Sequence, residues 1–290
     1  MNLQNYTTEM KISSSDKLQE RLRNIRHVAL DMDGTIYNGS TLFPFTVSFL
    51  KTLKELGIEY SFLTNNPSKS IDDYLAHLKE MGIEARRSEM YTAALASIEY
   101  LRKNHPEVKR LFILGTPSMI GEFEAAGFES ARNDAADTPD AVVIGFDTTL
   151  EYSRLCRAAW WISKGLLYIA TNPDRVCPTD EPVILVDCGS ICAALEHATG
   201  KTPDMVVGKP NPRMLGGILQ NRNLQPSQIA MVGDRIYTDV KMAHDAKALG
   251  VLVLSGETTP EVAERSDIKP DIIAKDLEEF GQMLIDAYQD

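Results

Sequence analysis

The sequence predicts an α/β fold in which crossover helices join the strands of a sheet. Short apolar runs alternate with amphipathic stretches from Arg26 to the end of the 290-residue chain. Several amphipathic stretches end just before a glycine, which is typical of helix C-termini. Polar residues follow four of the apolar runs. Because α/β proteins bind ligands at the carboxyl ends of parallel strands, this pattern favours a ligand site at one edge of the sheet.

The strands are predicted from short apolar runs bounded by turn residues, which suit strands that are buried on both faces. In chain order these runs are Val28–Leu30, Tyr60–Leu63, Leu111–Leu114, Val142–Gly145, Leu167–Ala170, Met205–Val207, Ile229–Val232, Val251–Leu254 and Ile272–Ala274. Helices are expected between them, among them Phe45–Leu56, Ile71–Met81 and Pro117–Ala126, each of which stops directly before a glycine.

Composition excludes several classes of protein. A formal net charge of -11 argues against sequence-independent nucleic-acid binding, which needs a basic surface. No apolar run approaches the length of a membrane span, and Met1–Asp16 lacks the basic-then-apolar order of a signal peptide. Four cysteines in a chain of this length are not a disulfide scaffold. We therefore expect a cytoplasmic protein with neither nucleic-acid nor membrane partners.

Two carboxylates and a glycine follow the first predicted strand, in Asp31-Met32-Asp33-Gly34. Alternate residues of a strand share a face, so Asp31 and Asp33 can leave its end on the same side. Burying both acids would cost on the order of several kcal/mol unless a metal or a function compensated. The alternative is a solvated Asp-Gly turn that caps the next element.

A second acidic segment follows another predicted strand, in Gly233-Asp234 with Asp239 five residues later. Asp234 can join Asp31 and Asp33 in an oxygen-rich site of the kind that Mg²⁺ prefers. Asp239 falls in the first turn of an expected helix around Thr238–Leu249, where it can ligate the ion or orient another ligand. A helix N-terminal acid that is favoured by the helix dipole explains Asp239 equally well, and both roles are compatible.

Two further strand ends carry hydrogen-bond donors. Thr64 and Asn65 follow one strand, and their hydroxyl and amide groups can both donate to a phosphate oxygen. Ser68 is expected to open a helix whose N-terminus faces the same region. Lys209 stands between glycine and proline after another strand, where it can serve as a fixed cation beside a phosphoryl group. Taken singly, an ordinary turn, a helix cap and an exposed lysine explain these residues as well.

In their order along the chain, these four motifs resemble those of the haloacid dehalogenase-like hydrolases. The matching residues are Asp31-Met32-Asp33-Gly34-Thr35, Thr64-Asn65, Lys209, and Gly233-Asp234 with Asp239. The surrounding sequence is similar to the nitrophenylphosphatase-like subfamily, which includes nucleotide, phosphoglycolate and pyridoxal phosphatases. The segments that carry this similarity are Thr64-Asn65-Asn66, Ala170-Thr171-Asn172-Pro173-Asp174, Gly189-Ser190 and Val207-Gly208-Lys209-Pro210. The resemblance runs from about Arg26 to the C-terminus.

The spacing of the motifs places an additional domain. About thirty residues separate Asp33 from Thr64, which is room for only one strand–helix unit, whereas a domain-sized stretch separates Asn66 from Lys209. The resemblance implies a Rossmann-like parallel-sheet core with an inserted α/β cap. We therefore assign 1–25 to an N-terminal arm, 26–105 and 204–290 to the core, and 106–203 to the cap. A mobile cap would exclude water from the reacting phosphate and contact the substrate.

The resemblance also implies the catalytic roles. Asp31 is expected to attack phosphorus and form an aspartyl-phosphate, while Asp33 protonates the leaving oxygen and later activates water. Mg²⁺ would be held by Asp31, by the backbone carbonyl of Asp33 and by Asp234, with Asp239 orienting a ligand. The phosphate-binding residues would be Gly34, Thr64, Asn65 and Lys209.

Substrate selection is expected from the cap segment Asn172–Ser190. Its polar residues Asn172, Asp174 and Arg175 are candidates for contact with the leaving group, although solvated loop residues are the simpler explanation. A second observation concerns Trp160-Trp161, which is expected to pack either in the cap core or at a homodimer interface formed by the cap.

Two other groups of residues resemble ligand-binding motifs, but less closely than the four motifs above. Gly200-Lys201-Thr202 imitates the end of a P-loop, but Leu195 stands where that motif needs a glycine. Cys188, Cys192 and His197 have loosely metal-like spacing, but a cysteine on a helix more often packs as a small apolar residue.

The function expected is a magnesium-dependent phosphatase of small phosphomonoesters, such as p-nitrophenyl phosphate in vitro and a sugar, nucleotide or other metabolite phosphate in vivo. One alternative is a phosphotransferase or mutase that passes the aspartyl-phosphate to an alcohol. Another is a regulatory protein that binds phosphate without turnover, which the complete set of Asp31, Asp33, Asp234 and Lys209 disfavours. A dehalogenase is disfavoured by Asp33, because a leaving halide needs no proton.

Overall fold

The computed structural model describes residues 16–179 and 181–289. The chain divides into two compact units, a first unit of Met1–Phe62 with Ile218–Asp290 and a second unit of Leu63–Gly217. The second unit contains the whole predicted cap, 106–203, together with the flanking residues 63–105 and 204–217. The cap boundaries stay a prediction, and so does the N-terminal arm of residues 1–25, most of which lies outside the described residues.

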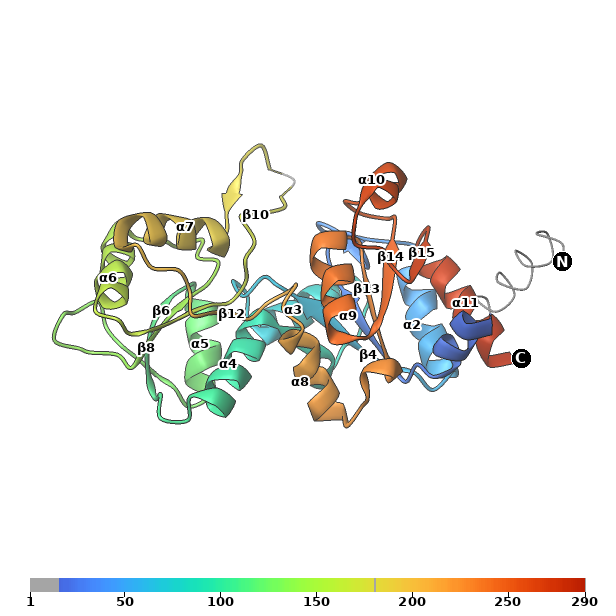
Figure 1. The fold of residues 1–290 in the computed structure, drawn as a ribbon, viewed down its shortest axis with the longest axis horizontal. Helices are drawn as coiled ribbons and strands as arrows, with labels where there is room; N and C mark the ends of the chain where they lie inside the picture. The colour runs from blue at the N-terminus through green and yellow to red at the C-terminus, as the bar shows by residue number, and fades with distance from the viewer. Residues whose placement is uncertain (1–15, 180, 290) are drawn as a thin grey trace, which may run out of the picture. The chain divides into compact units, whose positions relative to one another are not determined.

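A parallel sheet forms the centre of the first unit (Figure 1). Its strands follow the order β15-β14-β13-β1-β4, and β13 pairs in parallel with both β1 and β14. The bounds are β1 His27–Asp31, β4 Glu59–Thr64, β13 Ile229–Gly233, β14 Leu249–Val253 and β15 Ile272–Ala274. The parallel pairing and the helices between the strands confirm the α/β fold class.

Helices cover this sheet with their apolar sides. In α2 (Thr46–Glu55) the buried residues Thr46, Phe49, Leu50 and Leu53 follow the spacing of one helix face. Helix α11 (Leu277–Gln289) lies beside α2, and the ring centroids of Phe49 and Phe280 are 5.9 Å apart (Figure 1). Further helical elements of this part are η2 Pro226–Gln228, α9 Lys241–Ala246 and α10 Pro260–Arg265, while α8 Arg213–Arg222 spans the division between the two units after Gly217.

The helix expected around Thr238–Leu249 is shorter in the structure and begins differently. A π-helical turn, η3 (Ile236–Val240), leads into α9, which ends at Ala246. Lys247 then adopts a left-handed backbone conformation with φ 60°, which cannot continue a helix. Leu249 consequently opens β14 instead of closing the helix.

The second unit has a parallel sheet of its own. The strand order is β12-β9-β8-β6-β7, and every neighbouring pair is parallel. The strands are β6 Arg110–Leu114, β7 Glu129–Ser130, β8 Ala141–Ile144, β9 Leu167–Ala170 and β12 Met205–Val206. Further elements are α3 Ile71–Glu80, η1 Arg87–Glu89, β5 Met90–Thr92, α4 Ala93–Asn104, α5 Pro117–Ala125, α6 Tyr152–Ser163, β10 Val176–Cys177, β11 Leu185–Val186 and α7 Cys188–Thr199.

Apolar side chains of α6 and α7 pack on this sheet. Trp161 is 5% exposed and belongs to this core, as does Cys192. Trp160, the neighbour of Trp161, is instead 46% exposed, and Lys164 Nζ lies 4.3 Å from the centroid of its ring. The core location expected for the tryptophan pair therefore holds for Trp161, while the homodimer through the cap stays a prediction.

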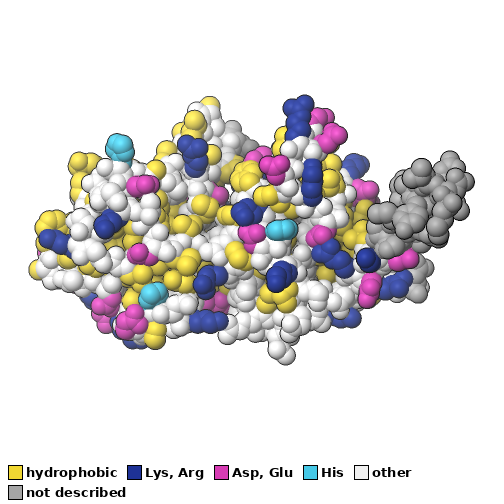
Figure 2. Space-filling view, in the orientation of Figure 1, with side chains coloured by type: hydrophobic (Ala, Val, Ile, Leu, Met, Phe, Trp, Pro, Cys, Tyr) yellow, Lys and Arg dark blue, Asp and Glu magenta, His cyan; other side chains and the backbone are white. Residues whose placement is uncertain are grey.

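Two features of the structure concern membrane and nucleic-acid binding. Within the described residues, no helix is long and apolar enough to cross a membrane. Figure 2 shows acidic and basic side chains interspersed over the visible face, which agrees with an acidic chain that lacks a continuous basic area there.

Candidate active site

Three carboxylates converge in the first unit. Asp31, Asp234 and Asp239 offer oxygens that all lie within 4.8 Å of one another. The parallel register explains this meeting, because Leu30 pairs with Val232 and so brings the residues that follow them to the same edge of the sheet. Asp239 enters from the π-helical turn η3. The sequence left two roles open for Asp239, a ligand or an orienting group, and its carboxylate lies in the cluster itself.

Glycines let the backbone approach these carboxylates closely. A Cβ on Gly34 would lie 2.4 Å from Asp234 Oδ2, and one on Gly256 would lie 2.1 Å from the same atom. A Cβ on Gly233 would lie 2.3 Å from Cγ of Asp239. Gly34 also has a φ of +83°, a conformation that other residues rarely adopt.

The environment of Asp234 fits a divalent cation. The side chain is buried, and this burial, together with the charges of Asp31 and Asp239, raises the pKa of the Asp234 carboxyl well above its usual range. Asp234 Oδ2 accepts a hydrogen bond from Glu257 N at 2.7 Å. Asp234 Oδ1 is buried and has no hydrogen-bond partner among the described residues. A buried, unpartnered oxygen in a group of three carboxylates is suited to Mg²⁺ or Ca²⁺, which prefer oxygen ligands.

The carboxylate of Asp33 is held outside this cluster. Its Oδ1 accepts a hydrogen bond from Gly39 N at 3.0 Å, and Gly34 N donates to Tyr37 O at 2.7 Å. Gly39 lies between β2 (Tyr37–Asn38) and β3 (Thr41–Leu42), an antiparallel hairpin that the sequence analysis did not predict. Asp33 is thus positioned by the hairpin that follows it.

A loop after β14 also supports the carboxylate cluster. Ser255 Oγ donates to Gly34 O at 2.8 Å, and Glu257 N donates to Asp234 as described above. Glu257 Oε2 forms an ion pair with Arg235 Nε at 2.8 Å. No motif in the sequence predicted this loop, although its position directly after a predicted strand of the same sheet was an available signal.

In the second unit, the side chain of Asn65 binds both backbone groups of Lys209. Asn65 Oδ1 accepts from Lys209 N at 2.7 Å, and Asn65 Nδ2 donates to Lys209 O at 3.0 Å. Asn65 Nδ2 also donates to Asp174 Oδ2 at 2.9 Å. An amide has two N–H donors, so protein acceptors occupy both donors of the Asn65 side chain. The peptide bond between Lys209 and Pro210 is cis.

Thr64 and the residues after it form a turn. Thr64 Oγ1 accepts from Asn66 N at 3.1 Å, and Ser68 N donates to Asn66 Oδ1 at 2.9 Å. The expectation that Ser68 opens the helix is therefore wrong. The N-cap of α3 is Ser70, whose hydroxyl accepts from Asp73 N while the Asp73 carboxylate accepts from Ser70 N.

The three candidates for substrate contact differ in their surroundings. Asn172 is buried, and its Nδ2 donates to Asp174 Oδ2 at 3.2 Å and to Asp187 Oδ1 at 3.1 Å. Burial raises the pKa of Asp187 to about 6, and this residue caps α7. Asp174 is half-buried and bonded to two amides. Arg175 is exposed.

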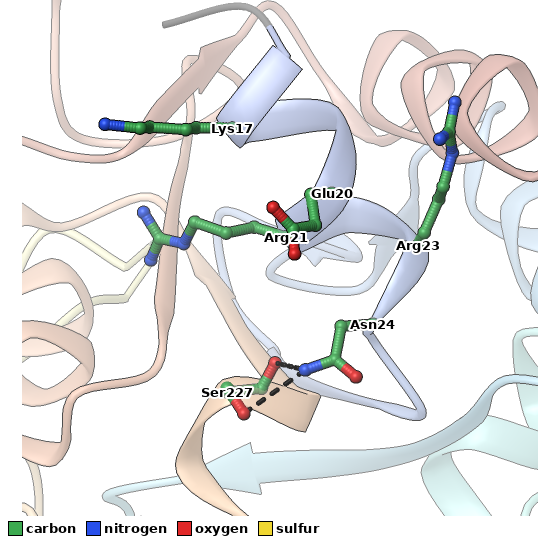
Figure 3. Close-up of a pocket in the computed structure, with 6 residues that line it drawn as sticks. All are labelled: Lys17, Glu20, Arg21, Arg23, Asn24 and Ser227. Carbon is green, nitrogen blue, oxygen red and sulfur yellow. Dashed lines mark hydrogen bonds between the residues drawn. The ribbon is translucent and has the colours of Figure 1, made fainter. Parts of the chain in front are cut away.

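Figure 3 shows a pocket elsewhere in the first unit. It is lined by Lys17, Glu20, Arg21, Arg23, Asn24 and Ser227, and none of these is a predicted site residue. Arg21 forms an ion pair with Asp271 at 2.5 Å, and Asn24 Nδ2 donates to Ser227 O at 3.1 Å. Because protein partners hold these polar groups, we place the candidate active site at the carboxylate cluster instead.

Comparisons with known proteins agree with the motifs. A family model described as haloacid dehalogenase-like hydrolase matches residues 28–129, and a second, HAD-hydrolase-like model matches residues 206–280. Ribonucleotide monophosphatase NagD of Escherichia coli K12 is 28% identical over 246 residues, which cover 85% of this chain and 94% of that protein.

Two solved structures are similar over most of the chain. A 4-nitrophenylphosphatase from Thermotoga maritima has a TM-score of 0.85 and 42% identity, with 90% of this chain and 98% of that chain covered. A glycerol phosphate phosphatase from Mycobacterium tuberculosis, in complex with magnesium, has a TM-score of 0.82 and 31% identity, with 90% of this chain and 78% of that chain covered.

Proposed function

This chain belongs to the haloacid dehalogenase-like hydrolases and is related to their nitrophenylphosphatase-like phosphatases, and we propose that it hydrolyses small phosphomonoesters through an aspartyl-phosphate on Asp31. The observation that carries this proposal is the cluster of Asp31, Asp234 and Asp239, whose oxygens lie within 4.8 Å of one another. Such a cluster fits a divalent cation, and a cation there would attract the phosphoryl group of the substrate.

Asp31, Asp234 and the backbone carbonyl of Asp33 are the groups that would hold Mg²⁺, with Asp239 as a further ligand or an orienting group. When bound, the ion supplies positive charge for the phosphoryl oxygens. The magnesium complex of the glycerol phosphate phosphatase supports the choice of ion. An oxygen of the Asp31 carboxylate attacks phosphorus, the bond from phosphorus to the ester oxygen breaks, and an acyl phosphate remains on Asp31.

Asp33 is assigned the proton transfers. As a general acid it protonates the departing ester oxygen, and as a general base it then removes a proton from the water that hydrolyses the aspartyl-phosphate. The hydrogen bond from Gly39 N to Asp33 Oδ1 supports this role, because it fixes the orientation of a carboxylate that the metal cluster does not use.

Gly34, Thr64, Asn65 and Lys209 are proposed to bind the phosphoryl group. Lys209 supplies a fixed positive charge in a chain whose net charge is -11. Thr64 can donate its hydroxyl proton to a phosphoryl oxygen. For Asn65 the two side-chain donors are already used, which favours its backbone as the group that faces the phosphate.

We assign substrate selection to the segment Asn172–Ser190 within a cap of residues 106–203. The two structural relatives and NagD are named for different small phosphates, a nitrophenyl ester, glycerol phosphate and ribonucleotides. A phosphomonoester is what these substrates share, so we propose a small phosphorylated metabolite as the substrate class. Arg175 is exposed and is the candidate in this segment for contact with a leaving group.

Phosphate release from p-nitrophenyl phosphate tests the proposal. We expect turnover with Mg²⁺, equal amounts of nitrophenolate and inorganic phosphate, and no turnover by Asp31→Asn. If added glycerol captured the phosphoryl group, so that nitrophenolate exceeded free phosphate, the protein would be a phosphotransferase. Binding of phosphate without any turnover in the wild-type protein would favour the regulatory alternative.

A further inference from the structure

The contact between Asn65 and Lys209 fixes the main chain of the lysine. One amide side chain pairs with the N–H and the C=O of the same residue, at 2.7 Å and 3.0 Å. This two-point contact restrains the position of the Lys209 backbone and therefore the origin of its side chain. Gly208, the residue before it, has no space for a Cβ, which would lie 2.6 Å from Asn65 Oδ1 and 2.6 Å from Thr171 O.

The carboxylate of Asp174 reinforces the orientation of the Asn65 amide that the main chain of Lys209 selects. A carboxylate only accepts hydrogen bonds, so the Asn65 atom that faces Asp174 must be the N–H-bearing Nδ2. The oxygen Oδ1 then faces Lys209 N, from which it accepts a hydrogen bond. The N–H and the C=O of Lys209 select the same orientation, and Asp174 adds a third hydrogen bond that a flipped amide would lose.

A further hydrogen bond, from Asn172, fixes the carboxylate of Asp174. The same oxygen, Oδ2, accepts from Asn172 Nδ2 at 3.2 Å, and Asn172 Nδ2 donates in turn to Asp187 Oδ1 at 3.1 Å. The backbone of this segment also packs on the start of α7, where a Cβ on Gly189 would lie 2.2 Å from Pro173 O. Gly189 N donates to Asp174 O at 2.7 Å. Asp174 is therefore part of a rigid contact and not of a solvated loop.

We propose that Asn65 and Asp174 are positioning residues for Lys209, and that Asp174 acts through Asn65 and not by contact with the leaving group. This inference rests on the proposed function, because Lys209 is the group that it positions. It revises the sequence-based expectation that Asp174 selects the substrate. A misplacement of a catalytic group by about 1 Å can lower a rate on the order of a hundredfold, so a contact of this kind can matter for catalysis.

Steady-state kinetics of Asp174→Asn, which keeps the size of the side chain, test the proposal. We expect kcat to fall about tenfold to a hundredfold for p-nitrophenyl phosphate, glycerol phosphate and a ribonucleotide monophosphate alike, with KM changed far less. Glu124→Gln on α5, an exposed carboxylate in the same unit, is the matched control and should leave kcat unchanged. Unequal changes in KM across the three substrates at constant kcat would overturn the proposal.

Two further variants test the route through Lys209. In a Lys209→Ala background, Asp174→Asn should cause little additional loss, because residues that act as a unit are not additive. The same factor of loss in both backgrounds would show that Asp174 acts independently of Lys209. The exchange Asn65→Asp with Asp174→Asn should recover part of the kcat that Asn65→Asp loses, since it restores one amide–carboxylate pair.

A readout that does not depend on turnover separates this proposal from the proposed function. Amide hydrogen exchange at Lys209 should be faster in Asp174→Asn than in the wild-type protein, and unchanged in Glu124→Gln, because Asn65 Oδ1 protects this N–H. If the wild-type protein had no phosphatase activity but Lys209 N still exchanged faster in Asp174→Asn, the positioning contact would be supported and the phosphatase proposal would fail. If the wild-type protein were an active phosphatase but the exchange rate of Lys209 N were the same in Asp174→Asn, the phosphatase proposal would stand and the positioning proposal would fail.

Discussion

Gly34 and Asp234, from the first and the fourth motif, lie in direct contact, and a Cβ on Gly34 would stand 2.4 Å from Asp234 Oδ2. The two motifs are 200 positions apart in the chain, and the parallel pairing of β1 with β13 brings them together. The carboxylate therefore has its position defined by backbone on one side and by Glu257 N on the other. This close fit makes the glycines of the site sensitive to the smallest substitution.

Gly256→Ala should impair the site without unfolding the protein. The new Cβ would meet Asp234 Oδ2 at 2.1 Å and displace the carboxylate, so we expect weaker Mg²⁺ binding and a loss of kcat/KM of about a hundredfold. Gly216→Ala on α8 is the control, because a Cβ there meets nothing within 4 Å and alanine favours a helix. Calorimetric Mg²⁺ titration checks the result, and equal affinity in Gly256→Ala and the wild-type protein would contradict it.

Removal of divalent cations should abolish activity reversibly. Asp31, Asp234 and Asp239 face one another closely, and a dianionic phosphate would be repelled by them without a cation. Chelation should therefore stop turnover, and added Mg²⁺ should restore it. Mg²⁺ should also raise the melting temperature of the wild-type protein, and less so that of Asp234→Asn. Full turnover after exhaustive chelation would contradict the assignment of a metal site.

Asp31→Asn and Asp33→Asn should fail in different ways. Loss of the nucleophile in Asp31→Asn should lower kcat on the order of a millionfold for every substrate. In Asp33→Asn the first step should suffer more for an alkyl phosphate, whose alcohol needs a proton to leave, than for p-nitrophenyl phosphate. Single-turnover burst kinetics separate this step from hydrolysis of the aspartyl-phosphate. Equal burst losses for both substrates would contradict the role of Asp33 as an acid.

The stability of the fold should depend on pH through His27. Burial, with a smaller effect of the Arg222 charge, lowers the pKa of this histidine from 6.5 to about 3. Its Nε2 lies 3.0 Å from Ser61 Oγ, and its Nδ1 is buried. Between pH 6.5 and 3 the unfolded chain binds a proton that the folded chain does not. The contribution of His27 to the free energy of unfolding should therefore fall as the pH is lowered, by up to about 1.4 kcal/mol per pH unit.

Denaturant unfolding over this pH range, in the wild-type protein and in His27→Gln, measures that contribution. Asp187 acts in the opposite direction, since its pKa is raised to about 6 and the folded state then binds the extra proton. The raised pKa of Asp234 acts in the same sense as that of Asp187. These two contributions are common to both proteins and cancel in the difference. A difference that does not change between pH 6.5 and 3 would show that His27 takes up its proton in the folded state.

The sequence predicted those parts of the fold that depend on local patterns. A buried parallel strand is a continuous apolar run, and the nine predicted runs coincide with β1, β4, β6, β8, β9, β12, β13, β14 and β15. Two-residue strands such as Tyr37–Asn38 are too short to form a pattern. The helix expected over Ile71–Met81 does begin at Ile71, but its cap is Ser70 and not Ser68, because only Ser70 is paired with Asp73 in a capping box.

The candidate site was predictable as a set of strand ends, but its contacts were not. The convergence of Asp31 and Asp234 follows from the parallel order of the strands alone. The bond between Asn65 and Asp174 joins residues 109 positions apart, and no spacing rule relates them. Both residues were singled out for substrate or phosphate binding because of their polarity, which is also what a buried hydrogen-bond network requires.

Arg175→Ala should alter substrate preference, unlike Asp174→Asn. The side chain of Arg175 is exposed, whereas its carbonyl oxygen accepts hydrogen bonds from Asp187 N at 3.1 Å and from Ser190 Oγ at 2.7 Å. Because these bonds hold the backbone, the side chain can be removed without disturbing the segment. Mg²⁺, Lys209 and Thr64 are proposed to bind the phosphoryl group that all substrates share, which leaves Arg175 to act on the variable leaving group. We expect unequal changes in kcat/KM across a panel of phosphates, each worth about 1–3 kcal/mol where a contact is lost. The largest loss should fall on substrates with an additional negative charge in the leaving group, because a guanidinium binds anions best. If Arg175→Ala slowed every substrate by one common factor, the side chain would have a structural role, and substrate selection would have to be sought elsewhere in the cap.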